Sequence, residues 1–242
     1  MANLTRFYVT IIVFLLCFQI SAQFTVGNLN LDGDIDKWYN QAIGYENLGF
    51  LEGAYYRIES QTIQQHQFFR SMSWLNGTIA IDGRLFKDVK ILYNTYKDVL
   101  LALNIGMEVH GVQSIKLNHY RIDSFLIEDA KFINLRGKNL PSAGSGFYQK
   151  YYDGVNISFY IKRIKIKSSD VETVVYNNND TKYVLYQDQY FRFNGKKSLY
   201  TMFPDKKKRI KKYIKQSPAR INKKTDDGLY ELMSYCDQLL LQ

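Results

Sequence analysis

Cysteine is nearly absent from this chain of 242 residues, which contains only Cys17 and Cys236. If Cys17 lies in a cleaved leader, as argued below, the exported chain has one cysteine and no internal disulfide. Hydrophobic packing alone must then stabilise the fold. Cys236 falls on the apolar side of a predicted helix, where a thiol is more often a buried structural residue than a reactive one. A cysteine nucleophile is therefore not expected.

Histidine is also scarce, with His66, His110 and His119 as the three examples. None has the spacing to another His or Cys that is typical of a zinc site. His66 precedes the pair Phe68-Phe69, and a lone His beside aromatic residues is usually packed or capping. No histidine is therefore assigned a catalytic or metal-binding role.

Three carboxylates alternate in the segment 31–36, LDGDID, which invites comparison with a calcium loop. An EF-hand loop requires Gly at its sixth position and Glu at its twelfth. Counted from Asp32, this chain has Lys37 at the sixth position and Ile43 at the twelfth. A turn with solvated acids is favoured, so the sequence predicts neither a metal site nor a cofactor.

Motifs for a serine nucleophile or a phosphate-binding loop are incomplete. Gly144-Ser145-Gly146 is a fragment of the G-x-S-x-G pattern of serine hydrolases. The surrounding segment 142–146 lacks the Gly-Lys-Ser/Thr that completes a phosphate-binding loop. Glycosidases use two placed carboxylates, which sequence alone cannot pair. No catalytic residue is assigned, and a hydrolase with an unrecognised carboxylate site remains an alternative.

The N-terminus predicts export. Arg6 precedes a continuous apolar run over residues 8–20, and Ser21-Ala22 supplies small residues for cleavage. This pattern is typical of a secretory signal peptide over residues 1–22. The run is short for a membrane span, which needs roughly 20 apolar residues, although an uncleaved anchor is the alternative. The expected location is the periplasm or cell envelope, or secretion, with no transmembrane helix after cleavage.

An antiparallel β domain is predicted over residues 23–197. Proline is rare, with three in the chain, and aromatic residues make up 15%. The clearest pattern is 74–105, where alternating apolar residues and the turn pair Asp82-Gly83 indicate a three-stranded meander. The fold class expected is mainly β, an antiparallel meander forming a sandwich or a partly open barrel.

Further strands are predicted on both sides of a loop rich in Gly and Ser at 137–146. They span residues 112–117, 119–127, 130–135, 147–153, 155–167, 171–176, 182–187 and 189–193. The loop is a possible boundary between two sheets, or between two halves of one sheet. Within 155–167 the apolar phase changes after Ile161, so a bulge or sharp bend is expected at Lys162-Arg163.

The segment 198–242 predicts two or three helices packed on the β domain. Ser198 is a candidate N-cap, Pro204 suits the first turn of a second helix, and Thr225 or Asp226 can open the last one. The last helix has a continuous apolar stripe. Its members are Leu229, Leu232, Met233, Cys236, Leu239 and Leu240.

The strongest binding signal is the basic segment 205–224. It contains ten Lys and Arg residues and one Asp, which accounts for the whole net charge of +9. The candidate anion-binding residues are Lys206, Lys207, Lys208, Arg209, Lys211, Lys212 and Lys215. Export argues against nucleic acid and favours anionic lipid or glycan. The alternative is a solvated face of an amphipathic helix.

An ordered series of weak motifs covers most of the chain after residue 22. It consists of residues 50–55, 66–69, 77–79, 82–83, 89–93, 146–148, 152–154, 197–199 and 203–208. The series resembles a family of uncharacterised exported bacterial proteins of the cell envelope. The resemblance implies a mostly β protein with a helical C-terminus and implies no activity. That family tends to carry Tyr-Asp where this chain has Tyr93-Asn94, so no carboxylate role transfers to that position.

Three functions are consistent with these observations. The first is a non-enzymatic binding or structural module of the envelope, with an unknown envelope component as its partner. The second is a binder of anionic lipid or glycan through the basic helix and an aromatic-lined β cavity. The third is the hydrolase considered above.

Overall fold

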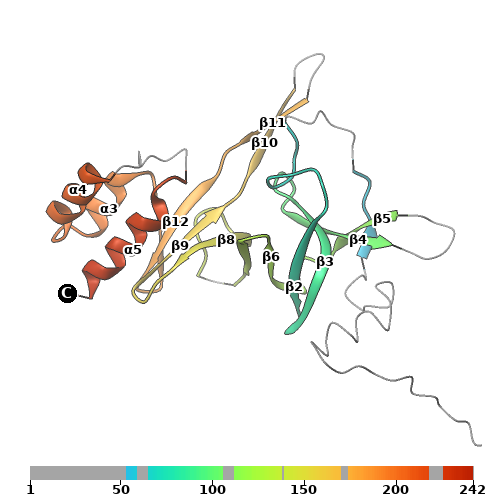
Figure 1. Ribbon diagram of the computed structural model, residues 1–242, viewed down its shortest axis with the longest axis horizontal. Helices are drawn as coiled ribbons and strands as arrows, with labels where there is room; N and C mark the ends of the chain where they lie inside the picture. The colour runs from blue at the N-terminus through green and yellow to red at the C-terminus, as the bar shows by residue number, and fades with distance from the viewer. Residues whose placement is uncertain are drawn as a thin grey trace, which may run out of the picture. The chain divides into compact units, whose positions relative to one another are not determined.

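Figure 1 shows the protein as a computed structural model that describes residues 53–58, 65–105, 112–137, 139–169, 174–217 and 226–241. One antiparallel sheet contains 11 strands in the order β1-β5-β4-β3-β2-β6-β7-β8-β9-β12-β13, and β10 pairs with β11 separately. The strands are β1 (Gly53–Tyr55), β2 (Leu75–Ile81), β3 (Arg84–Asn94), β4 (Val99–Ile105), β5 (Val112–Leu117), β6 (Ile122–Ile127), β7 (Ala130–Leu135), β8 (Gly146–Asp153), β9 (Ile157–Lys162), β10 (Lys165–Ser169), β11 (Val174–Asn178), β12 (Thr181–Tyr186) and β13 (Gln189–Arg192). The helices are α3 (Lys196–Met202), α4 (Lys207–Gln216) and α5 (Leu229–Leu240). The predicted mainly β fold with C-terminal helices is confirmed, and the sheet is open.

The predicted meander is present as β2, β3 and β4. Asp82 and Gly83 have φ angles of 49° and 76°, as a tight hairpin turn with two left-handed residues requires. Ile79 of β2 and Ile91 of β3 point into the core and are 0% exposed. The local pattern of the sequence therefore determines both the turn and the buried face.

One strand boundary differs from the prediction. Strand β6 begins at Ile122 rather than at residue 119, because the Arg121 N–H donates to the Asn118 carbonyl at 3.1 Å and closes a turn there.

Aromatic side chains fill the core of the meander half of the sheet. The Tyr93 ring meets the rings of Phe125, Phe132 and Phe147 edge-on, at centroid distances of 5.2, 5.0 and 5.8 Å. Such pairs contribute roughly 0.5–1.5 kcal/mol each beyond their buried area. The Tyr93 hydroxyl has a hydrogen-bond partner, because it donates to Asp98 Oδ1 at 2.7 Å. The high aromatic content therefore serves packing in this half.

The loop 137–146 does not separate two sheets. The strands on either side of it pair with each other, with Leu135 opposite Gly146 and Phe132 opposite Gln149. A continuous sheet therefore crosses this position. The alternative in which the loop divides one sheet from another is wrong, because β7 and β8 are close enough in sequence to pair directly.

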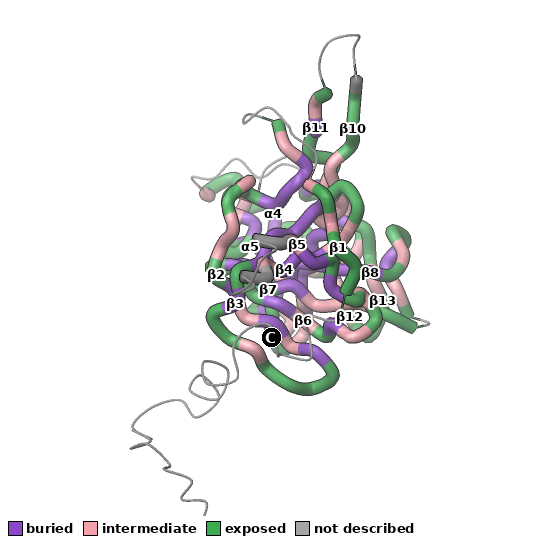
Figure 2. Tube along the Cα trace, turned by 90° about the vertical axis from the view of Figure 1, so that its right-hand side faces the viewer, coloured by how far each residue is buried: buried purple, intermediate pink, exposed green. Residues whose placement is uncertain are grey.

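The predicted bend at Lys162-Arg163 is confirmed. β9 ends at Lys162, and β10 begins at Lys165 and pairs only with β11 among the described strands. The change of apolar phase thus marks the point where the chain leaves the large sheet. The β10–β11 hairpin is mostly exposed where it is described (Figure 2).

The three helices of the described residues follow the β part, but their first residues differ from the prediction. Gly195, not Ser198, is the N-cap of α3, and Ser198 Oγ instead accepts the Asn194 N–H at 2.9 Å. Pro204 lies in a turn ahead of α4, whose N-cap is Lys206. Local cap preferences are weak, so tertiary contacts shift helix ends by a few residues.

The start of α5 has a specific reason. Its N-cap is Gly228 with φ 66°, and Asp226 lies outside the helix. The Asp226 carboxylate is used elsewhere, because its two oxygens contact Arg163 Nη2 at 2.6 Å and Lys182 Nζ at 2.8 Å. A side chain that forms two ion pairs is not available to cap a helix.

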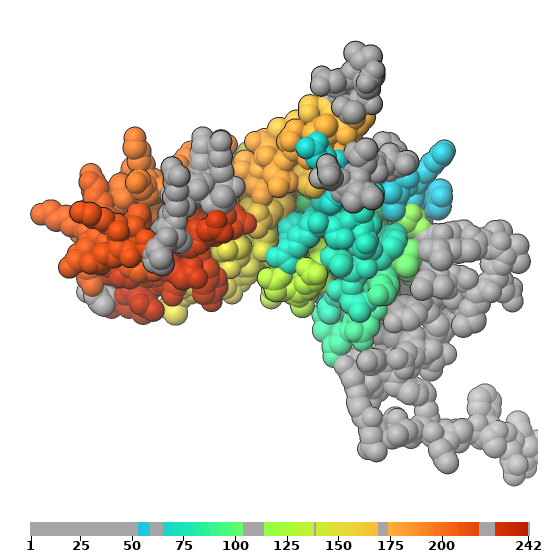
Figure 3. All heavy atoms as spheres, turned by 45° about the horizontal axis from the view of Figure 1, so that its top comes forward, coloured from blue at the N-terminus to red at the C-terminus, as the bar shows by residue number. Residues whose placement is uncertain are grey.

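Helix α5 docks on the sheet as predicted. It contacts β8 and β9, and its stripe is buried at Leu229, Leu232, Met233, Cys236 and Leu239. Figure 3 shows the helices, in orange and red, beside the strands in yellow. The predicted buried thiol is confirmed, since Cys236 is 1% exposed. No helix among the described residues has the length and apolar character to cross a membrane.

Candidate anion-binding surface

Helix α4 is attached to the protein by one narrow apolar edge. Ile210 is 1% exposed and belongs to the core cluster formed with α5 and β9, against which Tyr213 and Ile214 also pack. The Tyr213 ring stacks on the Tyr235 ring of α5 at a centroid distance of 4.1 Å. These contacts fix the helix by its apolar edge and leave the rest of its circumference for solvent.

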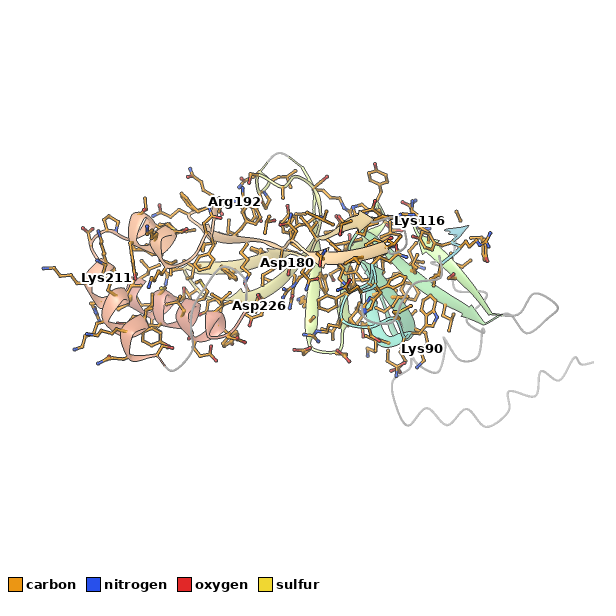
Figure 4. The ribbon with its side chains drawn as sticks, turned by 90° about the horizontal axis from the view of Figure 1, so that it is seen from above. Lys90, Lys116, Asp180, Arg192, Lys211 and Asp226 are labelled. Carbon is orange, nitrogen blue, oxygen red and sulfur yellow. The ribbon has the colours of Figure 1, made fainter. Side chains whose placement is uncertain are left out.

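The predicted anion-binding residues all gather on or next to α4, which we call the basic surface. Lys206, the N-cap, is half-buried, and the other six are exposed. The remaining members are Lys207, Lys208, Arg209, Lys211, Lys212 and Lys215. In Figure 4, Lys211 marks this helical end of the chain.

The lysines of the basic surface lack local compensation in the described part of the chain. Helix α4 has no acidic residue in its first turn, where the helix dipole favours anions and where Lys207, Lys208 and Arg209 stand instead. Like charges four residues apart, such as Lys207 and Lys211, destabilise a helix by about 0.2–0.5 kcal/mol per pair. Within the described part of the chain, the lysines of α4 form no ion pair. An external anion would relieve both effects.

A second charge cluster, which the sequence did not indicate, lies where β9 ends. Arg163 donates to Asp180 Oδ2 at 2.7 Å, to Asp226 Oδ2 at 2.6 Å and to Gln149 Oε1 at 2.7 Å. Lys182 completes the group through Asp226. Figure 4 shows Asp180 and Asp226 near each other beside the strands that adjoin the helices. This cluster ties the start of the α5 segment to β9 and β12.

The Asp226 carboxylate of this cluster does not suit general acid catalysis. Burial opposes ionisation of Asp226, but Arg163 and Lys182 outweigh it and hold its pKa below the ordinary value. A glycosidase needs one carboxyl group with a raised pKa. The Asp180–Arg163–Asp226 arrangement is typical of a structural ion-pair network. The only sign of this network in the sequence was the change of apolar phase near Arg163. That change does not indicate which residues pair with Arg163.

A further ion pair, between Lys162 and Asp98, joins the two halves of the sheet. Lys162 Nζ contacts Asp98 Oδ2 at 2.5 Å, and the Lys162 side chain is 8% exposed. The ammonium lies 4.9 Å from the centre of the Tyr148 ring. A Cβ at Gly146, which has φ 124°, would overlap both charged groups. The close packing leaves no room for a ligand there, so this pair is structural.

The histidines that are described behave as packed residues. His66 Nδ1 accepts the Phe68 N–H at 3.1 Å, as expected for a capping role. The His119 ring lies 4.4 Å from the Phe147 ring. Desolvation by burial lowers the pKa of both histidines. The prediction for His110 and for the acidic segment 31–36 falls outside the described residues.

No metal-binding arrangement is found in the described ranges, where no three His, Cys, Asp or Glu residues come together with suitable geometry. The signal segment 1–22 also lies outside the described residues. The resemblance to exported envelope proteins stays a prediction from the ordered motifs. Comparison with known protein families, with curated proteins and with solved structures finds no match to this chain.

Proposed function

We propose that this protein is a non-enzymatic binding module of the cell envelope that attaches to an anionic lipid surface through α4. The observation that carries the proposal is the basic surface itself. It places seven cations on one helix and its N-cap, and its lysines have no acidic partner in the described part of the chain. The predicted signal segment supports the envelope location.

The strength of such an attachment follows from the charges. Each Lys or Arg close to an anionic membrane contributes about 1 kcal/mol. Ile210 holds α4 to the core, so the helix backbone that carries the cations is fixed before binding. The attraction reaches only about 8 Å at physiological ionic strength. Binding should therefore be strong at low salt and weaken steeply as salt rises.

The experiment compares two variants with the same change in net charge. The test variant is K206E/K207E/K208E/K211E. The control is K90E/K116E/K131E/K167E, which reverses four exposed lysines of β3, β5, β7 and β10. Each full-length protein is sedimented with vesicles of phosphatidylglycerol and phosphatidylcholine, and with vesicles of phosphatidylcholine alone. Circular dichroism checks that each variant is folded.

We expect the wild-type protein and the control to bind the anionic vesicles and to be released by salt. The test variant should bind at least about a hundredfold more weakly, because four attractive charges become repulsive. Equal binding by the two variants would contradict the proposal. Binding of the wild type to a soluble acidic polysaccharide but not to the vesicles would replace lipid by glycan as the ligand.

A further inference from the structure

A polar cavity of about 690 Å³ lies at the Arg163 cluster, which consists of Arg163, Asp180, Lys182 and Asp226, and no described residue of α4 lines it. It is lined by the ends of β11, β12 and β13, by the chain ahead of α3 and by Asp226. Ligand pockets commonly have volumes of about 300 to 1,000 Å³. Most such pockets are apolar, whereas charged and amide side chains dominate this one, so a ligand here must itself be polar.

The charges of the cavity do not balance. It contains the cations Arg163, Lys182 and Arg192 and the carboxylates Asp180 and Asp226. The first two cations are held by the two carboxylates at 2.6 to 2.8 Å. Arg192 is exposed and forms no ion pair within the described part of the chain. The cavity therefore offers one guanidinium to an anionic group, with a fork of N–H donors that suits a carboxylate.

The uncharged polar side chains of the cavity are mainly amides. Asn178, Asn179 and Asn194 line it and are exposed. Each can donate and accept hydrogen bonds.

The carboxylates add acceptors. Asp180 Oδ1 accepts the Ile164 N–H at 3.0 Å and its Oδ2 accepts from Arg163. A carboxylate has about four lone-pair positions, so oxygen atoms that already serve a cation can accept a further bond from a hydroxyl. Donors, acceptors and one unpaired cation therefore surround the same space.

We propose that this cavity binds an acidic sugar residue, with its carboxylate on Arg192 and its hydroxyl groups on the asparagine amides and the carboxylates of Asp180 and Asp226. A hexuronate has this combination of one acid group and several hydroxyls. A neutral sugar lacks the partner for Arg192, and a simple anion leaves the hydroxyl-binding groups unused. The site is separate from the basic surface and does not depend on attachment to lipid.

The test titrates the full-length protein with glucuronate, glucose and inorganic phosphate and follows binding by NMR. The variants are R192Q, which removes the cation, and N178A, which removes one exposed amide of the lining. R84Q is the matched control, because Arg84 is also an exposed arginine of the sheet and does not line the cavity. The K206E/K207E/K208E/K211E variant is included to separate this site from α4.

We expect the wild type and R84Q to bind glucuronate, and R192Q to bind it about tenfold more weakly or worse, because a charge-assisted hydrogen-bond pair is lost. N178A should weaken the binding of glucuronate and of glucose alike. The α4 variant should bind glucuronate as the wild type does. Failure of the wild type to bind glucuronate, or equal binding by R192Q and R84Q, would overturn the proposal. Phosphate binding as tight as glucuronate binding would reduce the site to a simple anion site and overturn the assignment of a sugar.

Discussion

The Asp237 carboxylate of α5 accepts the backbone N–H of Asn156, at the turn between β8 and β9, with an N···O distance of 2.7 Å. The N–H groups of Val155 and Ile157 donate to the same carboxylate at 3.0 Å each. The Tyr152 hydroxyl adds a fourth bond at 3.2 Å. One side chain thus satisfies three consecutive backbone donors and fixes the last helix to the sheet.

Replacement of Asp237 should therefore destabilise the protein strongly. In D237A three donors of the turn lose their acceptor, and we expect a loss of about 3 kcal/mol in the free energy of unfolding. Urea denaturation followed by circular dichroism measures it. The control is D188A in the exposed β12–β13 turn, where we expect a smaller change. A loss below about 1 kcal/mol in D237A would show that the turn does not depend on this carboxylate.

The same contact predicts a pH dependence. Burial disfavours the charged form of Asp237, but the backbone donors of Asn156, Val155 and Ile157 outweigh it and lower its pKa below 3.8. A carboxyl group with a lowered pKa in the folded state stabilises the fold above its unfolded pKa of about 3.9, and this contribution is lost as the pH falls through the folded pKa. The stability difference between wild type and D237N should be constant above about pH 5 and shrink below about pH 4.

That measurement isolates Asp237 from other acids. Asp129, Asp153 and Asp226 also have lowered pKa values, but they are present in both proteins and cancel in the difference. A gap between wild type and D237N that widens on acidification would contradict the assignment.

The buried Asp98–Lys162 pair predicts coupled effects of mutation. K162M removes the cation that pairs with Asp98, whose side chain is 28% exposed. We expect a loss of about 3 kcal/mol. The double variant K162M/D98N should recover part of it, because no unpaired charge then remains and the oxygen of the introduced amide can still accept from Tyr93. Strictly additive losses in the double-mutant cycle would mean that the two side chains do not interact.

Cys236 should be unreactive in the folded protein. Burial, with a smaller effect of Asp237, raises the pKa of its thiol to about 12, and the thiolate is the reactive form. Treatment with iodoacetamide at neutral pH, followed by peptide mass spectrometry, should find Cys236 unlabelled without denaturant and labelled in urea. Equal labelling in both conditions would show that the docking of α5 on the sheet does not bury Cys236.

The features that were predicted from sequence are those whose signals are local. The Asp82-Gly83 turn, the phase change at Lys162 and the apolar stripe of α5 each follow from neighbouring residues. The roles of Asp226 and Asp237 were missed for a physical reason. Asp226 pairs with Arg163 across 63 residues, and Asp237 bonds to a turn 81 residues earlier, so no local pattern marks either partner.

The two candidate binding sites also differ in whether their residues are close together in the sequence. The basic surface was predicted because its charges are consecutive in the sequence. The cavity at Arg192 was not, because it combines residues from separate strands and the chain ahead of α5. Arg192 and Asn178 look like ordinary strand residues until β11, β13 and the Arg163 cluster are brought together.

Site-specific cross-linking in the native cell tests the attachment of α4 most directly. A photoreactive residue replaces Lys212 on the basic surface in one protein and Lys90 on β3 in another, and both positions are exposed. If α4 attaches to anionic lipid, we expect lipid to be cross-linked at position 212 and not at position 90. The yield at position 212 should fall when Lys206, Lys207, Lys208 and Lys211 are reversed in charge. Lipid cross-linked equally at both positions, or at neither, would contradict it.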